Sequence, residues 1–359
     1  MIVKRFARIC HAAGCRITRS LGRAERANIG KLVILCYHRV LPKEKKANYF
    51  LPDLVVTPDA LKSHCATLGR RFTVLPLHEA VDLFAEKKRW PRPVAAVTFD
   101  DGYQDNFRYA APILAENRIR ATFFVVTDLV GTDRLPWYDR MGKTIAALAD
   151  KGKVGRVLNA VGLGEGLDPT SQRPGNRHGL GGQVVRRAKE LAPFQRRVLL
   201  ERLAAEAGFD ATHDSDDLLM DWKQLERLID AGHEIGSHSR THEILTQLGE
   251  ASLQDEVTGS RRVLETGLGR TIRSFSYPNG AVDDAVARAV AEAGYRCAVG
   301  VETGPNPVEA DRFRLRRYFI HEERLSGWNG KASEALLRMK LCGLSDWRVS
   351  RSRRSAGVA

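Results

Sequence analysis

Cysteine is scarce in this 359-residue sequence, and the cysteines present are not paired. The six of them are scattered along the chain, and no two form a C-x-x-C motif. Regular cysteine spacing is the usual sign of a disulfide framework. We therefore expect reduced, mostly buried thiols, as is typical of a cytoplasmic protein.

Long hydrophobic runs are also missing. A secretory signal peptide needs an apolar stretch of about 7–15 residues, but basic residues interrupt every apolar run before Leu32. A membrane-spanning helix needs roughly 18 apolar residues, and no run approaches that length. We expect a cytoplasmic protein without signal peptide or transmembrane helix, in peripheral contact at most with the inner membrane face.

No nucleic-acid-binding module is recognisable, although the formal net charge is +14. The positive charge lies in residues 1–31, 151–202 and 338–359, with net charges of +7, +7 and +5. The first segment spaces apolar residues such as Ile2, Phe6 and Ile9 among its basic residues. This spacing predicts an amphipathic basic arm that binds an anionic membrane surface, with a solvated arm as the alternative. We expect no nucleic-acid partner.

The rest of the chain has the composition of a folded domain, with 43% hydrophobic and 28% charged residues. Strand-like apolar runs alternate with helical stretches from residue 32 onward, which predicts a parallel sheet covered by helices. Asp221 is expected to cap one helix. Residues 252–255, Ser-Leu-Gln-Asp, resemble a capping box that opens another.

Periodicity is lost between residues 151 and 190, where glycine and proline recur. Irregular stretches of this length inside a domain are usually lids, binding loops or disordered segments. We expect an irregular insertion that acts as a lid, with disorder as the alternative.

The stretch 97–103, Val-Thr-Phe-Asp-Asp-Gly-Tyr, carries the first concentration of chemistry. The apolar run 94–99 predicts a buried strand, and two carboxylates follow it directly. Because side chains of a strand alternate between its faces, Asp100 and Asp101 can face one way only if the chain turns. Gly102 permits that turn.

A second stretch, 236–242, places His238 and His242 after another strand-like run. Two histidines four residues apart lie on one face if the segment is helical. With one carboxylate they form a ligand set that suits zinc. An isolated pair at this spacing is more often a chance surface pair, but the aspartates at a strand end favour a metal site.

The third stretch, 273–280, reads Arg-Ser-Phe-Ser-Tyr-Pro-Asn-Gly and is again a strand that ends in a turn. The motifs T-F-D-D-G, H-S-R-T-H and this turn, in this order, resemble those of the polysaccharide deacetylase family, the NodB-homology domain of carbohydrate esterase family 4. The resemblance covers roughly residues 32–320 and implies an α/β fold, a distorted (β/α)7 barrel. The expected organisation is a basic arm (1–31), a barrel domain (32–325), and a C-terminal helix with a basic tail (326–359).

The resemblance also implies a role for each motif residue. Zn²⁺ or another divalent transition metal would be bound by Asp101, His238 and His242. Asp100 would be the general base, and Arg273 would pair with it and keep it ionised.

The turn of the third motif would bind the substrate through Tyr277, Pro278 and Asn279. The backbone N–H of Asn279 would help to hold the oxyanion. The family usually has an aromatic residue where Asn279 stands, so sugar stacking at this turn lacks its usual residue.

The proton donor for the leaving amine has two candidates. Histidine suits this step because its pKa lies near neutrality. The family's late leucine-x-histidine stretch has a weak counterpart at His321, in Phe-Ile-His. The opening 35–40, Leu-Cys-Tyr-His-Arg-Val, resembles a subgroup that begins with Y-H-x-[VI]. In circularly permuted relatives this early histidine, here His38, takes the acid's place. We expect His38 to be the acid, with His321 as the alternative.

The sequence thus predicts a metal-dependent hydrolase that removes N-acetyl groups from an amino-sugar glycan, either a polysaccharide or a lipid-linked oligosaccharide. One alternative is a relative in the same family that acts as an amidase or deformylase on a small amide. Another is a glycan-binding relative that has lost activity.

Overall fold

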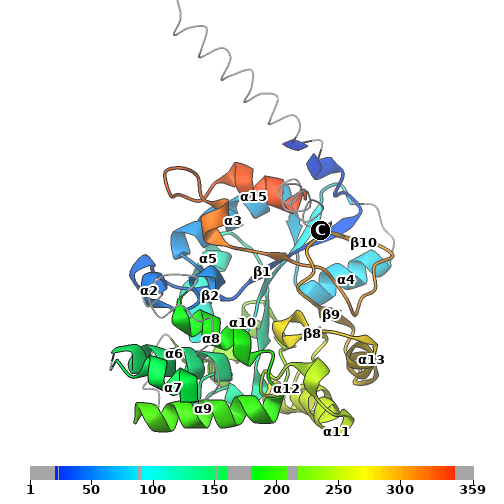
Figure 1. Cartoon of the computed structure of the whole chain (residues 1–359). Coiled ribbons are helices and arrows are strands. Elements are labelled where there is room, and N and C mark those ends of the chain that lie inside the picture. The colour runs from blue at the N-terminus through cyan, green and yellow to red at the C-terminus, as the bar shows by residue number, and fades with distance from the viewer. Residues whose placement is uncertain are drawn as a thin grey trace, which may run out of the picture.

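The computed structural model describes residues 21–22, 24–86, 90–150, 152–160, 179–208 and 217–343. In these residues a mixed sheet curls into an incomplete barrel with helices around it (Figure 1). The expected α/β fold, a distorted barrel of the polysaccharide deacetylase type, is confirmed. No helix among the described residues is long and apolar enough to span a bilayer.

The barrel sheet has the strand order β10-β1-β5-β6-β7-β8-β9, and β4 and β11 pair with β5 and β1 beside this path. Its strands are β1 (Lys31–Tyr37), β4 (Thr73–Val74), β5 (Val94–Phe99), β6 (Thr122–Val125), β7 (Glu234–Ser237), β8 (Ser274–Ser276), β9 (Cys297–Val299), β10 (Asn306–Pro307) and β11 (Tyr318–Phe319). All pairs are parallel except β1 with β10. A small separate sheet pairs β2 (Arg39–Val40) with β3 (Val55–Val56).

The chain segment around β11 joins the two sides of the barrel. Tyr318 pairs with Leu35 of β1, and Leu315 forms a bridge with Val299 of β9. One short segment near the C-terminal end therefore lies between β9 and β1. Its register decides which of its side chains enter the barrel.

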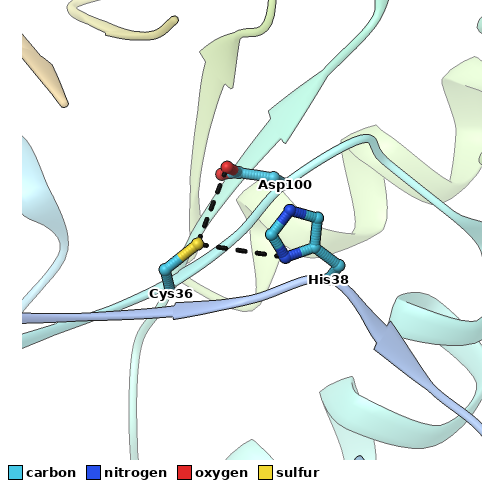
Figure 2. A group of neighbouring side chains, drawn as sticks. All are labelled: Cys36, His38 and Asp100. Atoms are coloured by element: carbon cyan, nitrogen blue, oxygen red, sulfur yellow. Dashed lines mark hydrogen bonds between the residues drawn. The ribbon is translucent and has the colours of Figure 1, made fainter. Parts of the chain in front are cut away.

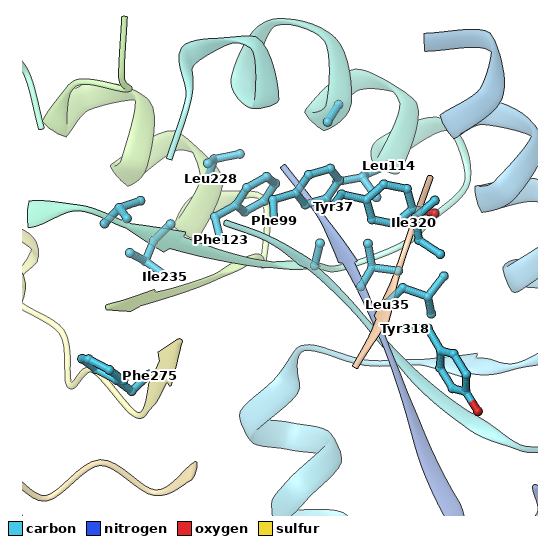
Figure 3. Close-up of a cluster of buried hydrophobic side chains, with 14 of the residues drawn as sticks. Leu35, Tyr37, Phe99, Leu114, Phe123, Leu228, Ile235, Phe275, Tyr318 and Ile320 are labelled. Carbon is cyan, nitrogen blue, oxygen red and sulfur yellow. The ribbon is translucent and has the colours of Figure 1, made fainter. Parts of the chain in front are cut away.

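Helices cover the outer face of the sheet and bury its outward side chains. These helices are α3 (Pro58–Arg71), α5 (Ala111–Glu116), α10 (Trp222–Asp230), α11 (Glu250–Gln254), α12 (Ser260–Leu268), α13 (Asp284–Glu292) and α15 (Glu334–Leu341). In this core the Phe99 ring stacks between Tyr37 and Phe123, at 5.3 and 5.0 Å between centroids (Figure 3). Short helices α2 (Lys43–Asn48) and α14 (Glu322–Leu325) lie in loops.

The inward side chains of the strands form a second, smaller core inside the barrel. It includes Ile34, Ala96, Phe124 and Val299, and helix α4 (Leu77–Ala85) packs its apolar face against it. Inward and outward residues alternate along each strand. The inward apolar side chains fill the part of the barrel interior near the amino ends of the strands. The functional side chains follow at the carboxyl ends.

Four helices form a layer with a core of its own: α6 (Trp137–Asp150), α7 (Val154–Ala160), α8 (Leu180–Ala188) and α9 (Pro193–Ala207). They lie together, in green, on one side of the barrel (Figure 1). The insertion predicted at 151–190 is therefore helical in α7 and α8, and the expectation of irregular structure is wrong there. Residues 161–178, in its middle, lie outside the described residues, and its role as a lid stays a prediction.

Of the two helix starts predicted from local signals, one is confirmed and one is wrong. Asp221 caps α10, and its carboxylate accepts a hydrogen bond from the Gln224 N–H at 2.8 Å. The capping box expected at 252–255 is wrong, because α11 begins earlier, at Glu250. Residues 1–20 of the basic arm and 344–359 of the tail lie outside the described residues, and the domain boundaries stay predictions.

Candidate active site

Four parallel strands end at the same edge of the barrel, and each is followed by residues that the sequence singled out. His38 follows β1, Asp100 follows β5, His238 follows β7, and the turn at Pro278 follows β8. Since the carboxyl ends of parallel strands share one edge, these residues meet at one mouth although they are far apart in sequence.

Asp100 and Asp101 both face this mouth because the chain reverses directly after β5. Asp101 and Gly102 adopt left-handed backbone conformations, with φ of 75° and 81°. A Cβ at position 102 would lie 2.9 Å from a Val125 methyl group, so only glycine fits the turn. The predicted turn at Gly102 is confirmed.

Three side chains predicted as metal ligands converge at the mouth. One carboxylate oxygen of Asp101, Oδ1, lies 3.4 Å from Nε2 of His238 and 3.3 Å from Nε2 of His242. The three side chains are buried, and their ligand atoms lie within 4.8 Å of one another. Two imidazoles and a carboxylate form a set that suits zinc or a similar transition metal.

The tautomer of His238 also fits a metal ligand. Its Nδ1 donates a hydrogen bond to the Ser276 carbonyl oxygen at 2.7 Å, which leaves Nε2 with a free lone pair toward Asp101. Metal-binding histidines usually donate their other N–H in this way. The residues present therefore fit a divalent metal.

The two histidines converge through a loop and not through a helix. Residues 238–244 are non-helical, and Ser239 and His242 have positive φ of 64° and 63°. Glu256 accepts hydrogen bonds from the Arg240 and Thr241 N–H groups at 2.8 and 3.0 Å. The helical arrangement considered for this motif is wrong, and the loop is held by a buried carboxylate.

The ligand set has the electrostatics of a cation site. Burial alone would raise the pKa of Asp101, but the adjoining imidazoles of His238 and His242 bring it well below its usual range. Burial lowers the pKa of His242, with Asp101 opposing. The carboxylate is therefore ionised at neutral pH, as a metal ligand must be.

Asp100 is paired with Arg317 and not with Arg273. The guanidinium donates from Nη1 to Oδ1 and from Nη2 to Oδ2, both at 2.7 Å, and both side chains are buried. Burial would raise the pKa of Asp100, but Arg317, with His238 and His38, lowers it to about 2. The expected pairing with Arg273 is wrong.

The position of Arg273 in the chain explains why it does not pair with Asp100. It directly precedes β8 and lines a pocket of about 410 Å³ with His78 and His233, at the amino ends of the strands. Ser276 at the other end of the same strand is the residue of this motif that reaches Asp100, with Oγ 3.3 Å from Oδ2.

His38 lies in the site, next to Asp100 and Cys36 (Figure 2). The Cys36 thiol lies 3.7 Å from Asp100 Oδ2 and 3.9 Å from Nδ1 of His38. Burial lowers the pKa of His38, while Asp101 and Asp100 raise it. Asn106 donates a hydrogen bond at 2.8 Å to the His38 carbonyl oxygen and fixes its backbone.

His321 has a different environment. Burial lowers its pKa to about 4, and the charged groups that act on it are Arg324, Asp53 and Lys340 and neither of the two aspartates after β5. The Phe319 ring contacts both histidine rings, at 4.9 Å from His38 and 4.6 Å from His321. Of the two candidate acids, only His38 has a pKa that is raised by the charges of Asp100 and Asp101.

The three predicted substrate-binding residues in the turn after β8 differ in their exposure to solvent. The Tyr277 side chain is buried in the outer core and donates a hydrogen bond to the Phe313 carbonyl oxygen at 2.8 Å. The prediction that the Tyr277 side chain binds the substrate directly is therefore wrong. Pro278 is buried, and Asn279 is exposed in a left-handed conformation with φ of 57°.

Sequence reasoning missed Arg317 and Glu256. Arg317 lies in a segment with two other arginines, and only the register of β11 shows which one enters the barrel. Glu256 lies on the helical stretch after α11, where nothing local marks it as a support for the histidine loop.

The sequence matches the family described as polysaccharide deacetylase over residues 87–156 and 195–298. The gap between the two matched parts contains the end of α7, all of α8 and the residues between them. This chain belongs to the polysaccharide deacetylase family. No curated protein matches the sequence.

Solved structures show the same fold at low sequence identity. Streptococcus pyogenes deacetylase PplD, in complex with acetate, is 17% identical to this chain, with a TM-score of 0.56. The superposition covers 87% of this chain and 99% of the PplD chain. A de-N-acetylase from Aggregatibacter actinomycetemcomitans is 16% identical with a TM-score of 0.54, covering 84% and 98%. IcaB from Ammonifex degensii is 17% identical with a TM-score of 0.51, covering 81% and 92%.

Proposed function

We propose that this protein is a metal-dependent hydrolase that removes N-acetyl groups from an amino-sugar glycan, a polysaccharide or a lipid-linked oligosaccharide. Family membership supports deacetylation of a glycan. The observation that carries the proposal is the ligand set Asp101, His238 and His242 directly beside an ionised, buried Asp100.

The metal ligands and the base have separate tasks in this reaction. A bound Zn²⁺ or similar ion supplies Lewis acidity toward the acetyl carbonyl and the attacking water. Asp100 takes a proton from that water as the general base. Arg317 keeps Asp100 ionised and oriented, and Oδ1, which accepts a hydrogen bond from Nη1 of the guanidinium, retains a second lone pair for the proton of the water.

Two further groups complete the reaction. The backbone N–H of Asn279, in the turn after β8, would donate to the oxyanion of the tetrahedral intermediate. His38 would protonate the amine as the C–N bond breaks. Its place beside Asp100 supports this role.

Acetate release tests the proposed function. Zinc-loaded protein would be incubated with N-acetylated oligosaccharides, lipid-linked amino sugars, N-formylated sugars and small amides. We expect acetate from an acetylated glycan, with turnover lower by about 10²–10⁴-fold in Asp100→Asn. Release only from formylated sugars or small amides would identify a deformylase or amidase. Glycan binding without release would identify an inactive relative.

The basic ends support a second part of the proposal, a peripheral contact with an anionic membrane on the cytoplasmic side. Residues 1–31 and 338–359 carry net charges of +7 and +5, and basic residues near such a surface contribute about 1 kcal/mol each. The test is salt-sensitive binding to vesicles that contain anionic lipid. Binding that survives deletion of both ends, or recovery of a processed form outside the cell, would contradict it.

A further inference from the structure

The end of helix α8 brings a lysine to the turn after β8. The Lys189 ammonium donates a hydrogen bond to Oδ1 of Asn279 at 2.7 Å. The Gln247 side-chain amide donates to the Lys189 carbonyl oxygen at 2.8 Å and fixes the backbone there. The side chain is therefore placed at the mouth by two contacts, one of them with the predicted oxyanion residue.

The charge of Lys189 reaches the metal ligand set. Burial lowers the pKa of Lys189, and the charges of Arg186 and Arg196 also lower it. The carboxylate of Asp101 raises it. The helical layer thus places a cation within electrostatic range of Asp101.

The hydrogen-bond partner shown for this ammonium is a neutral amide. Arg196, a buried cation that also acts on Lys189, already pairs with Glu243 at 3.2 Å and with Gln247 at 2.8 Å. A partly desolvated ammonium gains most from an anionic partner, because charge-assisted hydrogen bonds are roughly twice as strong as neutral ones. A neutral sugar would supply no such partner.

We propose that Lys189 and Asn279 form a subsite for an anionic group, a phosphate or a carboxylate, carried by the amino-sugar substrate near the acetamide that is cleaved. This inference rests on the proposed function and narrows its substrate to acidic glycans. Lys189 binds the anion, and the Asn279 side chain holds the ammonium in place. The subsite takes the position of the aromatic residue that the family usually has.

Three oligosaccharides of equal length test the proposal: a neutral N-acetylchitooligosaccharide, the same with one phosphate, and an alternating N-acetylglucosamine–glucuronate oligomer. We expect Lys189→Met to lower kcat/KM for the acidic substrates by about 10–100-fold, mainly through KM. The neutral substrate should change by less than about 3-fold. The acidic substrate that is affected identifies phosphate or carboxylate as the group bound.

Matched variants separate charge from structure. Lys189→Arg keeps the positive charge and should retain the preference for the acidic substrate. Asn279→Asp tolerates the left-handed backbone and neutralises the ammonium, so it should weaken the preference. Lys223→Met, on exposed surface of α10, is the control and should change nothing. Equal losses on neutral and acidic substrates in Lys189→Met would overturn the subsite.

Equilibrium binding distinguishes failure of the subsite from failure of the proposed function. Calorimetry with the Asp100→Asn variant measures affinity for the same oligosaccharides without turnover. Tighter binding of an acidic oligosaccharide that is lost in Asp100→Asn/Lys189→Met supports the subsite, even if wild-type protein releases no acetate. Equal affinity for neutral and acidic oligosaccharides, or no binding of either, overturns it.

Discussion

The guanidinium of Arg317 and the carboxylate of Asp100 form a bidentate ion pair inside the barrel, with both N–O distances 2.7 Å. Arg317 also donates to the Gly300 carbonyl oxygen at 2.8 Å and to Thr98 Oγ1 at 3.2 Å. The arginine is thus held by β5 and by the residue that follows β9. Its charge offsets the burial of Asp100, which would otherwise favour the protonated acid.

Removal of this charge should move the acid limb of the pH–rate profile. In Arg317→Met, burial raises the pKa of Asp100 from its value of about 2. The base is then protonated at higher pH, so activity should be lost first at the acid end, between about pH 4 and 7. Acetate release at a series of pH values measures this, and Arg317→Lys should restore much of the profile.

Arg273→Met is the matched control for the arginine prediction. Arg273 lies before β8 at the opposite end of the strand from Ser276, so its loss should leave the acid limb unchanged. If Arg273→Met shifts the limb and Arg317→Met does not, the observed ion pair is not the one that sets the base.

The metal ligand set predicts loss of metal without loss of fold. His242→Ala should remove most bound zinc and acetate release, since one of three ligands is missing. Its ring lies at the mouth and not in the cores, so the thermal unfolding temperature of the metal-free protein should change little. Metal content after dialysis is the measurement. His78→Ala, at the other end of the barrel, should keep the metal; full metal content in His242→Ala would contradict the ligand assignment.

The proton donor can be assigned by comparing two histidines. His38→Ala should lower turnover by about 10²–10⁴-fold, the usual scale for lost acid–base catalysis, with unchanged zinc content. The alkaline limb of the rate profile should disappear with it. His321→Ala should have little effect, since neither Asp100 nor Asp101 is among the charged groups that act on His321. The reverse pattern would assign the acid to His321.

A buried carboxylate at the amino ends of the strands predicts a pH-dependent stability. Glu234 accepts hydrogen bonds from Ser274 Oγ at 2.5 Å and Thr122 Oγ1 at 2.7 Å, and its Oε1 lies 3.1 Å from Nδ1 of His78. Glu234→Ala leaves these buried groups unpaired and should lower the free energy of unfolding by about 2–5 kcal/mol. Urea denaturation measures this, with the exposed Glu292→Ala as control.

The sign of the pH effect follows from the two partners. Although burial opposes both shifts, the contact lowers the pKa of Glu234 and raises the pKa of His78. The carboxylate contributes above its unfolded pKa of about 4.3, and this is lost as pH falls through its folded pKa. The imidazolium contributes below about 6.5, and this is lost as pH rises through its folded pKa. The stability difference between wild type and Glu234→Ala should therefore be largest between these values; a difference independent of pH would contradict the pairing.

Local signals were enough to predict the parts of the site that lie at strand ends. The apolar run of β5 and the glycine after Asp101 specify a buried strand and a tight turn from nine consecutive residues. The same holds for the position of His238 directly after β7. Because the strands are parallel, predicting each strand end also predicted that these side chains meet.

Arg317 could not be predicted because its role depends on register between distant segments. Tyr318 lies opposite Leu35, and a shift of one residue would turn Arg316 inward in its place. The backbone of the histidine loop is equally nonlocal, since the positive φ of Ser239 and His242 is held by tertiary contacts such as that of Glu256. Within α8, Gly181 weakens the helical signal, but it packs against Phe50, and a Cβ at position 181 would lie 3.4 Å from the Phe50 Cβ.

The segment around β11 also has a consequence for how the protein acquires activity during folding. Asp100 and Arg317 are separated by 217 positions, so their ion pair closes a long loop, and the entropy of loop closure disfavours its formation before the preceding strands are in place. Until then the base lacks its cation and the barrel lacks the strand between β9 and β1. A nascent or truncated chain that ends before residue 317 therefore has the metal ligands but not the ionised base. Catalytic competence should appear late in folding, together with the last strand.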